Sequence, residues 1–179
     1  HRLDKDTSGI LLIAKDSESH EKLSSQFKNR KIKKEYLALV AGRVEPSQGR
    51  IALPIGRHPK DRKKMSVHSY SPRHAETLWK VLEQFQNASL LQLDIKTGRT
   101  HQIRVHCAAM HHPIMGDAVY GRPSANILKS EDGNSVPISR QMLHARRIEF
   151  QHPKTMSRIS FQSETPHDMR RIVEILRGI

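Results

Sequence analysis

The ten residues ASLLQLDIKT, from Ala88 to Thr97, show most directly what class of fold this chain adopts. Leu91, Leu93 and Ile95 alternate with polar residues, and a period of two places these three side chains on one face of an extended strand. The segment is therefore predicted to be a strand with one face in the core and the other in water.

Short apolar runs on both sides of this segment predict more strands. Gly9–Ala14 is a continuous apolar run behind a glycine, which is the pattern of a central strand buried on both faces. Tyr36–Val40 is a second such run and is stopped by Gly42. Further strand patterns occur at Gly49–Gly56, Leu143–Phe150 and Ser157–Gln162.

One segment, Ala75–Phe85, has an ambiguous period. Leu78, Leu82 and Phe85 suit a helical stripe, whereas residues 77, 79 and 81 suit a strand. Periodicity alone leaves both interpretations open.

Capping signals predict helices between the strands. The first follows a cap at Asp16 or Ser17 and ends near Lys31, and the second is capped by Thr100 and ends before Pro113. On the second helix the apolar stripe is Ile103, Cys107 and Met110, and the polar side begins with Arg104.

A closing helix is predicted from Thr165 as cap, Pro166 as first residue and Asp168 in a capping-box position. The segments 57–64 and Ser124–Ser139, the latter containing Glu131 and Asp132, have the composition of surface loops. Because the strands do not alternate strictly with helices, we expect one α+β domain built on a largely antiparallel sheet.

The charge balance indicates the kind of partner. Lys and Arg total 31 against 18 Asp and Glu, which gives a net charge of +13. Such an excess favours polyanions, although a basic surface can also serve solubility alone. The single Cys excludes an internal disulfide framework, so a reducing, cytoplasmic location is expected. The sequence contains no apolar run long enough for a transmembrane helix and no leader.

The first dense polar stretch is His1-Arg2-Leu3-Asp4-Lys5-Asp6-Thr7-Ser8-Gly9, placed directly before a predicted strand. Asp4 or Asp6 could supply a catalytic carboxylate there, or could merely hold a turn or a surface ion pair. The absence of an initiator Met ahead of this run suggests a fragment.

The second dense stretch is Thr97-Gly98-Arg99-Thr100-His101-Gln102-Ile103-Arg104-Val105-His106. A helix N-terminus beside Arg99 favours a bound phosphate or carboxylate. Arg99 and Arg104 could equally brace the helix by binding the protein's own Asp residues, and an Arg that braces a catalytic Asp would serve both purposes.

These two stretches resemble the HRLDxxTSG and TGRTHQIRxH motifs of the RluA family of RNA pseudouridine synthases. Three further runs follow in the family's order: Lys34–Val40, His112–Asp117 with Tyr120-Gly121, and Gln141–Ala145. The resemblance covers nearly the whole chain, and agreement over several long motifs is far more specific than one short pattern.

The resemblance implies the roles of the central residues. Asp4 matches the catalytic aspartate, Tyr36 matches the tyrosine that lies against the target base, and Arg104 matches the arginine that pairs with the catalytic carboxylate. Leu3 and Ile103 are expected to form apolar walls beside these groups. Arg2 is expected to help hold the RNA distorted while the uridine is flipped out.

Basic residues outside the site would bind phosphates without reading the base sequence. Arg99 is one, and Arg57, Arg62, Lys63 and Lys64 form a cluster that could alternatively be only a solvated loop.

The family also implies a mixed, mainly antiparallel sheet with flanking helices and a central catalytic cleft, which favours a strand for Ala75–Phe85. Residues 1–179 would be one catalytic domain without its amino-terminal portion, and any S4-like domain would lie upstream. The expected activity is isomerisation of uridine in RNA by a monomer without a cofactor. Large-subunit ribosomal RNA is favoured as the substrate, and tRNA is the alternative.

Parts of the sequence are also compatible with two other functions. A metal site built from His101, His106, His111 and His112 would suit a nuclease, but the sequence has neither HExxH nor a Cys cluster, so no metal is expected. An inert basic RNA-binding module on the same fold would explain the charge without any chemistry.

Overall fold

The computed structural model describes residues 1–129 and 133–178 and contains one seven-stranded sheet. Its order is β1 (Ser8–Gly9), β10 (Leu143–Gln151), β2 (Lys33–Ala41), β7 (Ala88–Ile95), β6 (Thr77–Gln84) and β3 (Gln48–Ile51), with β11 (Arg158–Gln162) also paired to β10. Among the described strands of this sheet, only β1 and β10 run parallel. The expected α+β class with a mainly antiparallel sheet is confirmed.

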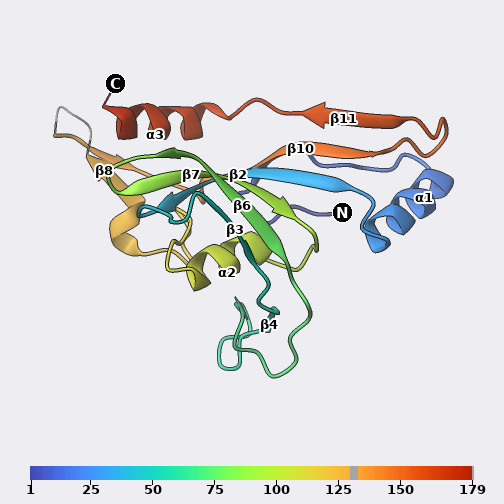
Figure 1. Cartoon of the computed structure of the whole chain (residues 1–179), viewed down its shortest axis with the longest axis horizontal. Coiled ribbons are helices and arrows are strands. Elements are labelled where there is room, and N and C mark those ends of the chain that lie inside the picture. The colour runs from blue at the N-terminus through green and yellow to red at the C-terminus, as the bar shows by residue number, and fades with distance from the viewer. Residues whose placement is uncertain (130–132, 179) are drawn as a thin grey trace.

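Helices lie on both sides of this sheet. In Figure 1, α3 (His167–Arg177) lies along one side, whereas α2 (Gln102–Ala109) and the hairpin of β4 (Gly56–Arg57) and β5 (Met65–Ser66) project from the other. The main core joins sheet residues such as Leu39 and Leu91 to Ile103 and Cys107 from α2 and Met169 from α3. α1 (Ser17–Lys28) packs at one end of the sheet on a smaller cluster.

The predicted strands at 36–40 and 88–97 are confirmed in register with each other, because Tyr36 pairs with Leu93 and Ala38 with Leu91. The segment 75–85 forms β6, so the helical alternative is wrong. The strands expected near 143–150 and 157–162 are also present. Of 49–56, only the part up to Ile51 continues in the main sheet.

The prediction of a central strand over Gly9–Ala14 is wrong. Only Ser8–Gly9 pairs with β10, and Ile13 is 73% exposed. The physical reason is that the same edge of β10 is occupied from Arg147 onward by β11, so the chain beyond Gly9 meets no free strand edge. Ile10 and Leu12 instead pack on the smaller cluster beneath α1.

The first helix begins as predicted, with Asp16 accepting a 2.7 Å hydrogen bond from the backbone N–H of Ser19, and it ends at Lys28. The other two caps are wrong. His101, not Thr100, precedes α2 and has a left-handed φ of 55°, while the side chain of Gln102 accepts hydrogen bonds from the Arg99 amide at 3.0 Å and from the Thr97 hydroxyl at 2.7 Å. The buried side chain of Gln102 thus stabilises the turn, and Thr100 is exposed on the surface.

The closing helix begins at His167 after Pro166, without a side-chain cap from Thr165. Asp168 does not complete a capping box, because its carboxylate accepts two hydrogen bonds from Arg140 at 2.6 and 2.8 Å.

The loop expected over 124–139 is more regular than predicted. It contains a 3-10 helix, η1 (Pro123–Asn126), and a hairpin of β8 (Ile127–Lys129) and β9 (Ser135–Pro137). Glu131 and Asp132 lie outside the described residues. None of the helices in the described parts is long and apolar enough to span a bilayer.

Candidate active site

The turn that carries Asp4 is clamped by the segment that leads into β10. Gln141 donates hydrogen bonds to the Lys5 carbonyl at 2.6 Å and to the Thr7 hydroxyl at 3.1 Å, and the Asp4 carbonyl accepts from the Thr7 amide at 3.1 Å. The two Asp residues of this turn have different surroundings. Asp4 lines a cavity, whereas Asp6 is exposed with φ of 66°.

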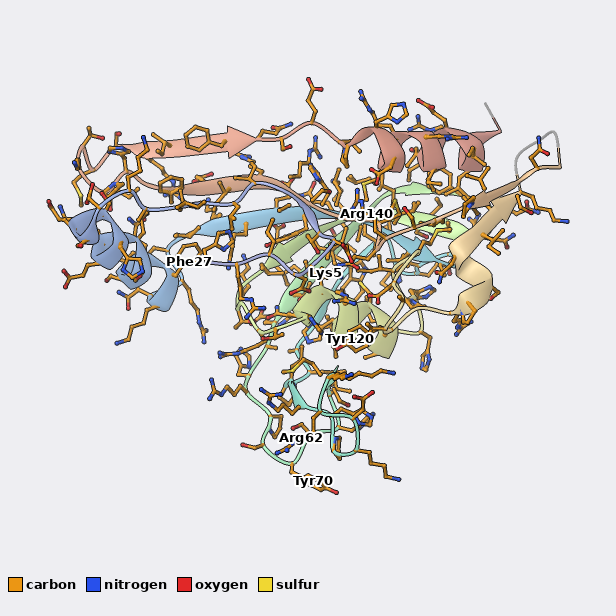
Figure 2. The ribbon with its side chains drawn as sticks, turned by 180° about the vertical axis from the view of Figure 1, so that it is seen from behind. Lys5, Phe27, Arg62, Tyr70, Tyr120 and Arg140 are labelled. Carbon is orange, nitrogen blue, oxygen red and sulfur yellow. The ribbon has the colours of Figure 1, made fainter. Side chains whose placement is uncertain are left out.

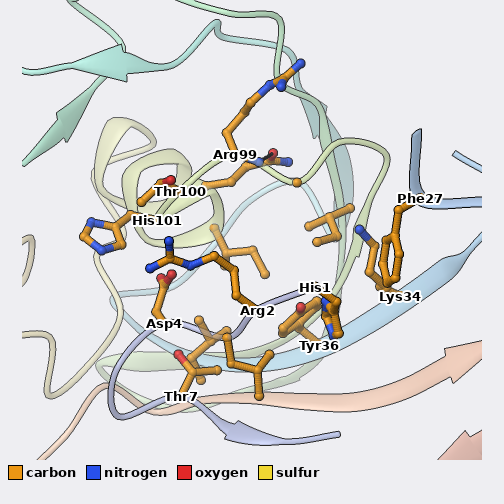
Figure 3. Close-up of a pocket in the computed structure, with 16 residues that line it drawn as sticks. His1, Arg2, Asp4, Thr7, Phe27, Lys34, Tyr36, Arg99, Thr100 and His101 are labelled. Carbon is orange, nitrogen blue, oxygen red and sulfur yellow. Dashed lines mark hydrogen bonds between the residues drawn. The ribbon is translucent and has the colours of Figure 1, made fainter. Parts of the chain in front are cut away.

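The cavity has a volume of about 320 Å³ and is bounded by β2, the β7–α2 connection and the turn before β1. Its apolar wall comprises Leu3, Tyr36, Ile95, Ile103 and Leu143. Figure 3 shows Asp4 with Arg2 and His101 on one side of the cavity, and Phe27 with Lys34 on the other. Leu3, Ile103 and Tyr36 therefore lie around one opening together with the Asp4 carboxylate.

Arg104 approaches Asp4 from α2. Its Nη1 lies 3.6 Å from Asp4 Oδ2, and the two side chains are 6% and 17% exposed. Arg104 was expected at the start of the polar side of α2, and that prediction is wrong because the residue is buried. A buried guanidinium is costly unless carboxylates lie beside it. Arg104 can face the interior because two carboxylates are present there.

Asp117 supplies most of that compensation, and the sequence argument missed it. Its carboxylate accepts hydrogen bonds from Arg104 Nε at 2.7 Å and Nη2 at 2.9 Å, and its own side chain is fully buried. The backbone amides of Val119 and Tyr120 donate to it as well, at 2.9 and 3.0 Å. The bidentate pair fixes the guanidinium plane and leaves Nη1 facing Asp4.

The pKa values of this pair follow from burial and partners. Burial alone would raise the pKa of Asp117, but the hydrogen bonds from Arg104 and the two amides hold it below its ordinary value. Burial likewise opposes the charged form of Arg104, yet the Asp117 hydrogen bonds and the charges of Asp117 and Asp4 hold the Arg104 pKa above its usual range. Both groups therefore stay charged at neutral pH.

The only signal for Asp117 in the sequence was its place after Gly116 in one of the motif runs. Nothing in the 13-residue spacing shows that it would meet Arg104.

Tyr36 lies on β2 with 7% of its surface exposed. Burial, together with the negative charge of Asp4, raises the pKa of the Tyr36 phenol to about 12. The ring is thus neutral at physiological pH and forms part of the cavity wall.

A second tyrosine, Tyr120, ties the site to the projecting hairpin. Its ring lies 5.0 Å from Arg104 Cζ, its hydroxyl is 2.8 Å from His101 Nδ1, and it accepts a 2.8 Å hydrogen bond from the Met65 amide. Burial lowers the pKa of His101, although the negative charge of Asp4 acts in the opposite direction and raises it.

Most of the basic residues predicted to bind phosphates lie around one hollow, but Lys64 does not. Arg57, Arg62 and Lys63 line a second hollow of about 720 Å³, which Arg2 and Arg99 also line. Lys64 is not part of this hollow and pairs with Asp61 at 3.9 Å. Arg99 is held by a 2.9 Å hydrogen bond from its Nε to the His74 carbonyl.

The histidines considered as metal ligands point to different partners. His106 contacts the Thr77 hydroxyl and the Leu53 carbonyl, both at 2.9 Å, and His112 contacts the Ala41 carbonyl at 2.9 Å. Within residues 1–129 and 133–178, no three His, Cys, Asp or Glu side chains are grouped so that they could hold a metal ion.

Comparisons with known proteins show which family the chain resembles. Residues 1–109 match the family described as RNA pseudouridylate synthase. The chain is 42% identical over 179 residues to "Ribosomal large subunit pseudouridine synthase D" of Nitrosomonas europaea, covering 100% of this chain and 51% of that protein. It is 39% identical over 177 residues to an uncharacterized RNA pseudouridine synthase of Bacillus subtilis, covering 99% and 55%.

Among solved structures, the human RNA Pseudouridylate Synthase Domain Containing 1 superposes with a TM-score of 0.78 at 29% identity, covering 100% of this chain and 79% of that one. The chain spans about half the length of the curated relatives it matches.

Proposed function

Because the chain belongs to the RNA pseudouridylate synthase family, we propose that it converts uridine within RNA to pseudouridine, with the Asp4 carboxylate as the reacting group. The observation that carries this proposal is the placement of Asp4 in the cavity, 3.6 Å from the buried Arg104. The Arg104 guanidinium places a positive charge directly beside the Asp4 carboxylate.

The reaction exchanges one bond to the sugar for another. The bond from N1 to C1′ breaks, the uracil turns, and C5 bonds to C1′, after which C5 loses its proton and N1 carries one. The product has the same atoms as the substrate, so no oxidant or reductant is consumed. An ionised Asp4 attacks C1′ or assists departure of the base, as carboxylates do in glycosyl transfer.

The surrounding residues serve binding and orientation. Tyr36, whose pKa is raised to about 12 by burial and by the charge of Asp4, stays neutral and packs against the flipped base. Leu3 and Ile103 close the apolar wall. Removing a uridine from its stack costs a few kcal/mol, roughly, and Arg2 with the basic residues of the second hollow offsets that cost by binding the backbone.

The substrate proposed is large-subunit ribosomal RNA. The support is the 42% identity to a relative whose name gives that substrate. A tRNA substrate is the competing outcome, and a parallel assay on both RNAs separates them.

The test compares Asp4→Asn with Asp6→Asn in the intact protein. Both variants remove one carboxylate from the same turn, and Asn tolerates the left-handed backbone of residue 6. Pseudouridine released by digestion of modified RNA should fall at least about 10³-fold for Asp4→Asn, because the reacting group is lost. RNA binding should change little, and Asp6→Asn should retain activity. Normal turnover by Asp4→Asn would overturn the proposal.

A further inference from the structure

A third hollow lies on the other side of the cavity from the projecting hairpin. It has a volume of about 410 Å³ and lies between the end of α1 and the β7–α2 connection. Its lining includes five cations, which are Lys28, Arg30, Lys34, Lys96 and Arg99. We call it the α1 groove.

The three hollows adjoin one another, because they share lining residues. The α1 groove shares Phe27, Lys34, Gly98 and Arg99 with the central cavity. The second hollow, lined by Arg57, Arg62 and Lys63, is called the hairpin-side hollow. It shares Arg2, Gly98, Arg99, Thr100 and His101 with the central cavity. Gly98 and Arg99 line all three, so Arg99 stands at the junction. Figure 2 shows Phe27 at the α1 side and Arg62 on the projecting hairpin.

The charged residues that line the three hollows are almost all cations. Among the described residues that line the three hollows, Asp4 carries the only carboxylate. None of Lys28, Arg30, Lys34 and Lys96 forms an ion pair with a carboxylate in the described parts of the chain, whereas Lys33, on the opposite face of β2 from Lys34, lies 3.6 Å from Glu149. Cations without a carboxylate partner beside a cavity for a flipped nucleotide are available to phosphates.

Lys34 connects the groove to the cavity. Its Nζ lies 5.5 Å from the centre of the Phe27 ring, and the lining of both hollows includes it. Burial lowers the pKa of Lys34, so a phosphate beside this ammonium would restore the stabilisation that water no longer supplies.

Resting on the proposed function, we propose that the α1 groove binds the backbone phosphates of an unpaired RNA segment on one side of the target uridine, while the hairpin-side hollow binds those on the other side. The RNA strand crosses the central cavity between the two hollows, and Arg99 contacts it at the crossing. Tyr70, which is 92% exposed on the lining of the hairpin-side hollow, offers a ring face to a neighbouring base.

The test uses the intact protein and a fluorescently labelled single-stranded uridine-containing RNA, with affinity measured across a salt series. Three sets of substitutions are compared. The groove set is Lys28→Gln, Arg30→Gln and Lys96→Gln. The hairpin set is Arg62→Gln, Lys63→Gln and Arg73→Gln, and all three residues line the hairpin-side hollow. The control set is Lys129→Gln, Arg170→Gln and Arg171→Gln. The control cations are exposed and line none of the three hollows.

Each set removes three charges, so a purely global charge effect would make all three variants alike. The proposal predicts that the groove set and the hairpin set each weaken binding by roughly 10- to 100-fold at 0.1 M salt and reduce the salt slope by about 2, as expected for three lost phosphate contacts. The control set should stay within about twofold, and thermal unfolding should show that all three variants are folded.

Binding of the groove variant at the level of the control variant would overturn the inference. That result is distinct from failure of the proposed function, because pseudouridine formation by the unsubstituted protein is measured on the same RNA. If RNA affinity depends on the groove cations but no pseudouridine is formed, the proposed strand path is supported and the proposed activity is contradicted.

Discussion

The centre formed by Asp4, Arg104 and Asp117 and the projecting hairpin both contain ion pairs, but the pair in the centre is buried and the pair in the hairpin is exposed. In the centre, Arg104 is 6% exposed and Asp117 is fully buried, and the guanidinium contacts Asp117 through Nε and Nη2 and Asp4 through Nη1. In the hairpin, the closest comparable pair is Lys64 and Asp61, 3.9 Å apart with side chains 42% and 44% exposed.

The difference shows where charge is used for position and where it is used for attraction. A buried, bidentate pair holds one geometry because leaving either charge alone in the interior is costly. An exposed pair is screened and loses little when it opens, so its cations remain free to meet a ligand. The structure therefore places a buried, bidentate charge pair beside the proposed reacting carboxylate, and exposed cations on the hairpin that the proposed function assigns to RNA binding.

The largest expected effect comes from removing the cation of the centre. Arg104→Met should lower the free energy of unfolding by about 3–5 kcal/mol, because Asp117 would be left buried and uncompensated. Urea denaturation at pH 7 measures this. Arg104→Lys is the matched control, since it keeps the charge and loses the bidentate geometry, and should cost less. A loss below about 1 kcal/mol for the Met variant would contradict the buried-pair interpretation.

The next effect separates the two regions kinetically. Asp117→Asn should lower kcat on RNA by roughly 10²-fold, because Arg104 would no longer be held in place against Asp4. Arg62→Gln with Lys63→Gln should instead act mainly on KM. The comparison is made under conditions where both variants are folded. An Asp117→Asn variant whose change lies only in KM would show that the pair does not position the reacting carboxylate.

A pH dependence sharpens the comparison further. The folded-state pKa of Tyr36 is raised from 10.0 to about 12 by burial and by the charge of Asp4, so the neutral phenol stabilises the fold below pH 10 and this contribution is lost as pH rises toward 12. Relative to Tyr36→Phe, the wild-type protein should lose about 1 kcal/mol of stability between pH 10 and 11. Chemical denaturation of both proteins over this range checks the sign, and parallel pH curves for the two would contradict it.

The smallest effect is expected in the hairpin. Lys64→Gln breaks the exposed pair with Asp61 and should change the free energy of unfolding by less than about 0.5 kcal/mol. Thermal unfolding at low and high salt is the measurement. A larger, salt-sensitive loss would mean that the hairpin is held by its charges rather than open to a ligand.

Several elements could be predicted because their signals are local. The alternation in 88–97 and the apolar run at 36–40 are set by which face of a strand is buried, and both strands formed in register. The start of α1 was equally local, since Asp16 caps it through a residue three positions away.

Other predictions failed where distant segments compete. Gly9–Ala14 has the composition of a buried strand, but β11 takes the adjacent edge of β10. Arg104 was predicted on the polar side of α2, but it is buried between two carboxylates. The resemblance implied its pairing with Asp4, 100 positions earlier, whereas its bidentate partner Asp117 was not predicted.

The sequence by itself determined the strand faces, the basic charge and the two motif stretches that contain Asp4 and Arg104, because side-chain polarity and spacing are local properties of the chain. Only the tertiary structure decided that Asp117 anchors Arg104, that Asp4 and not Asp6 meets the cavity, and that three hollows join at Arg99. Those relations arise from the pairing of strands and the packing of α2, which bring together residues whose separation along the chain carries no record of their contact.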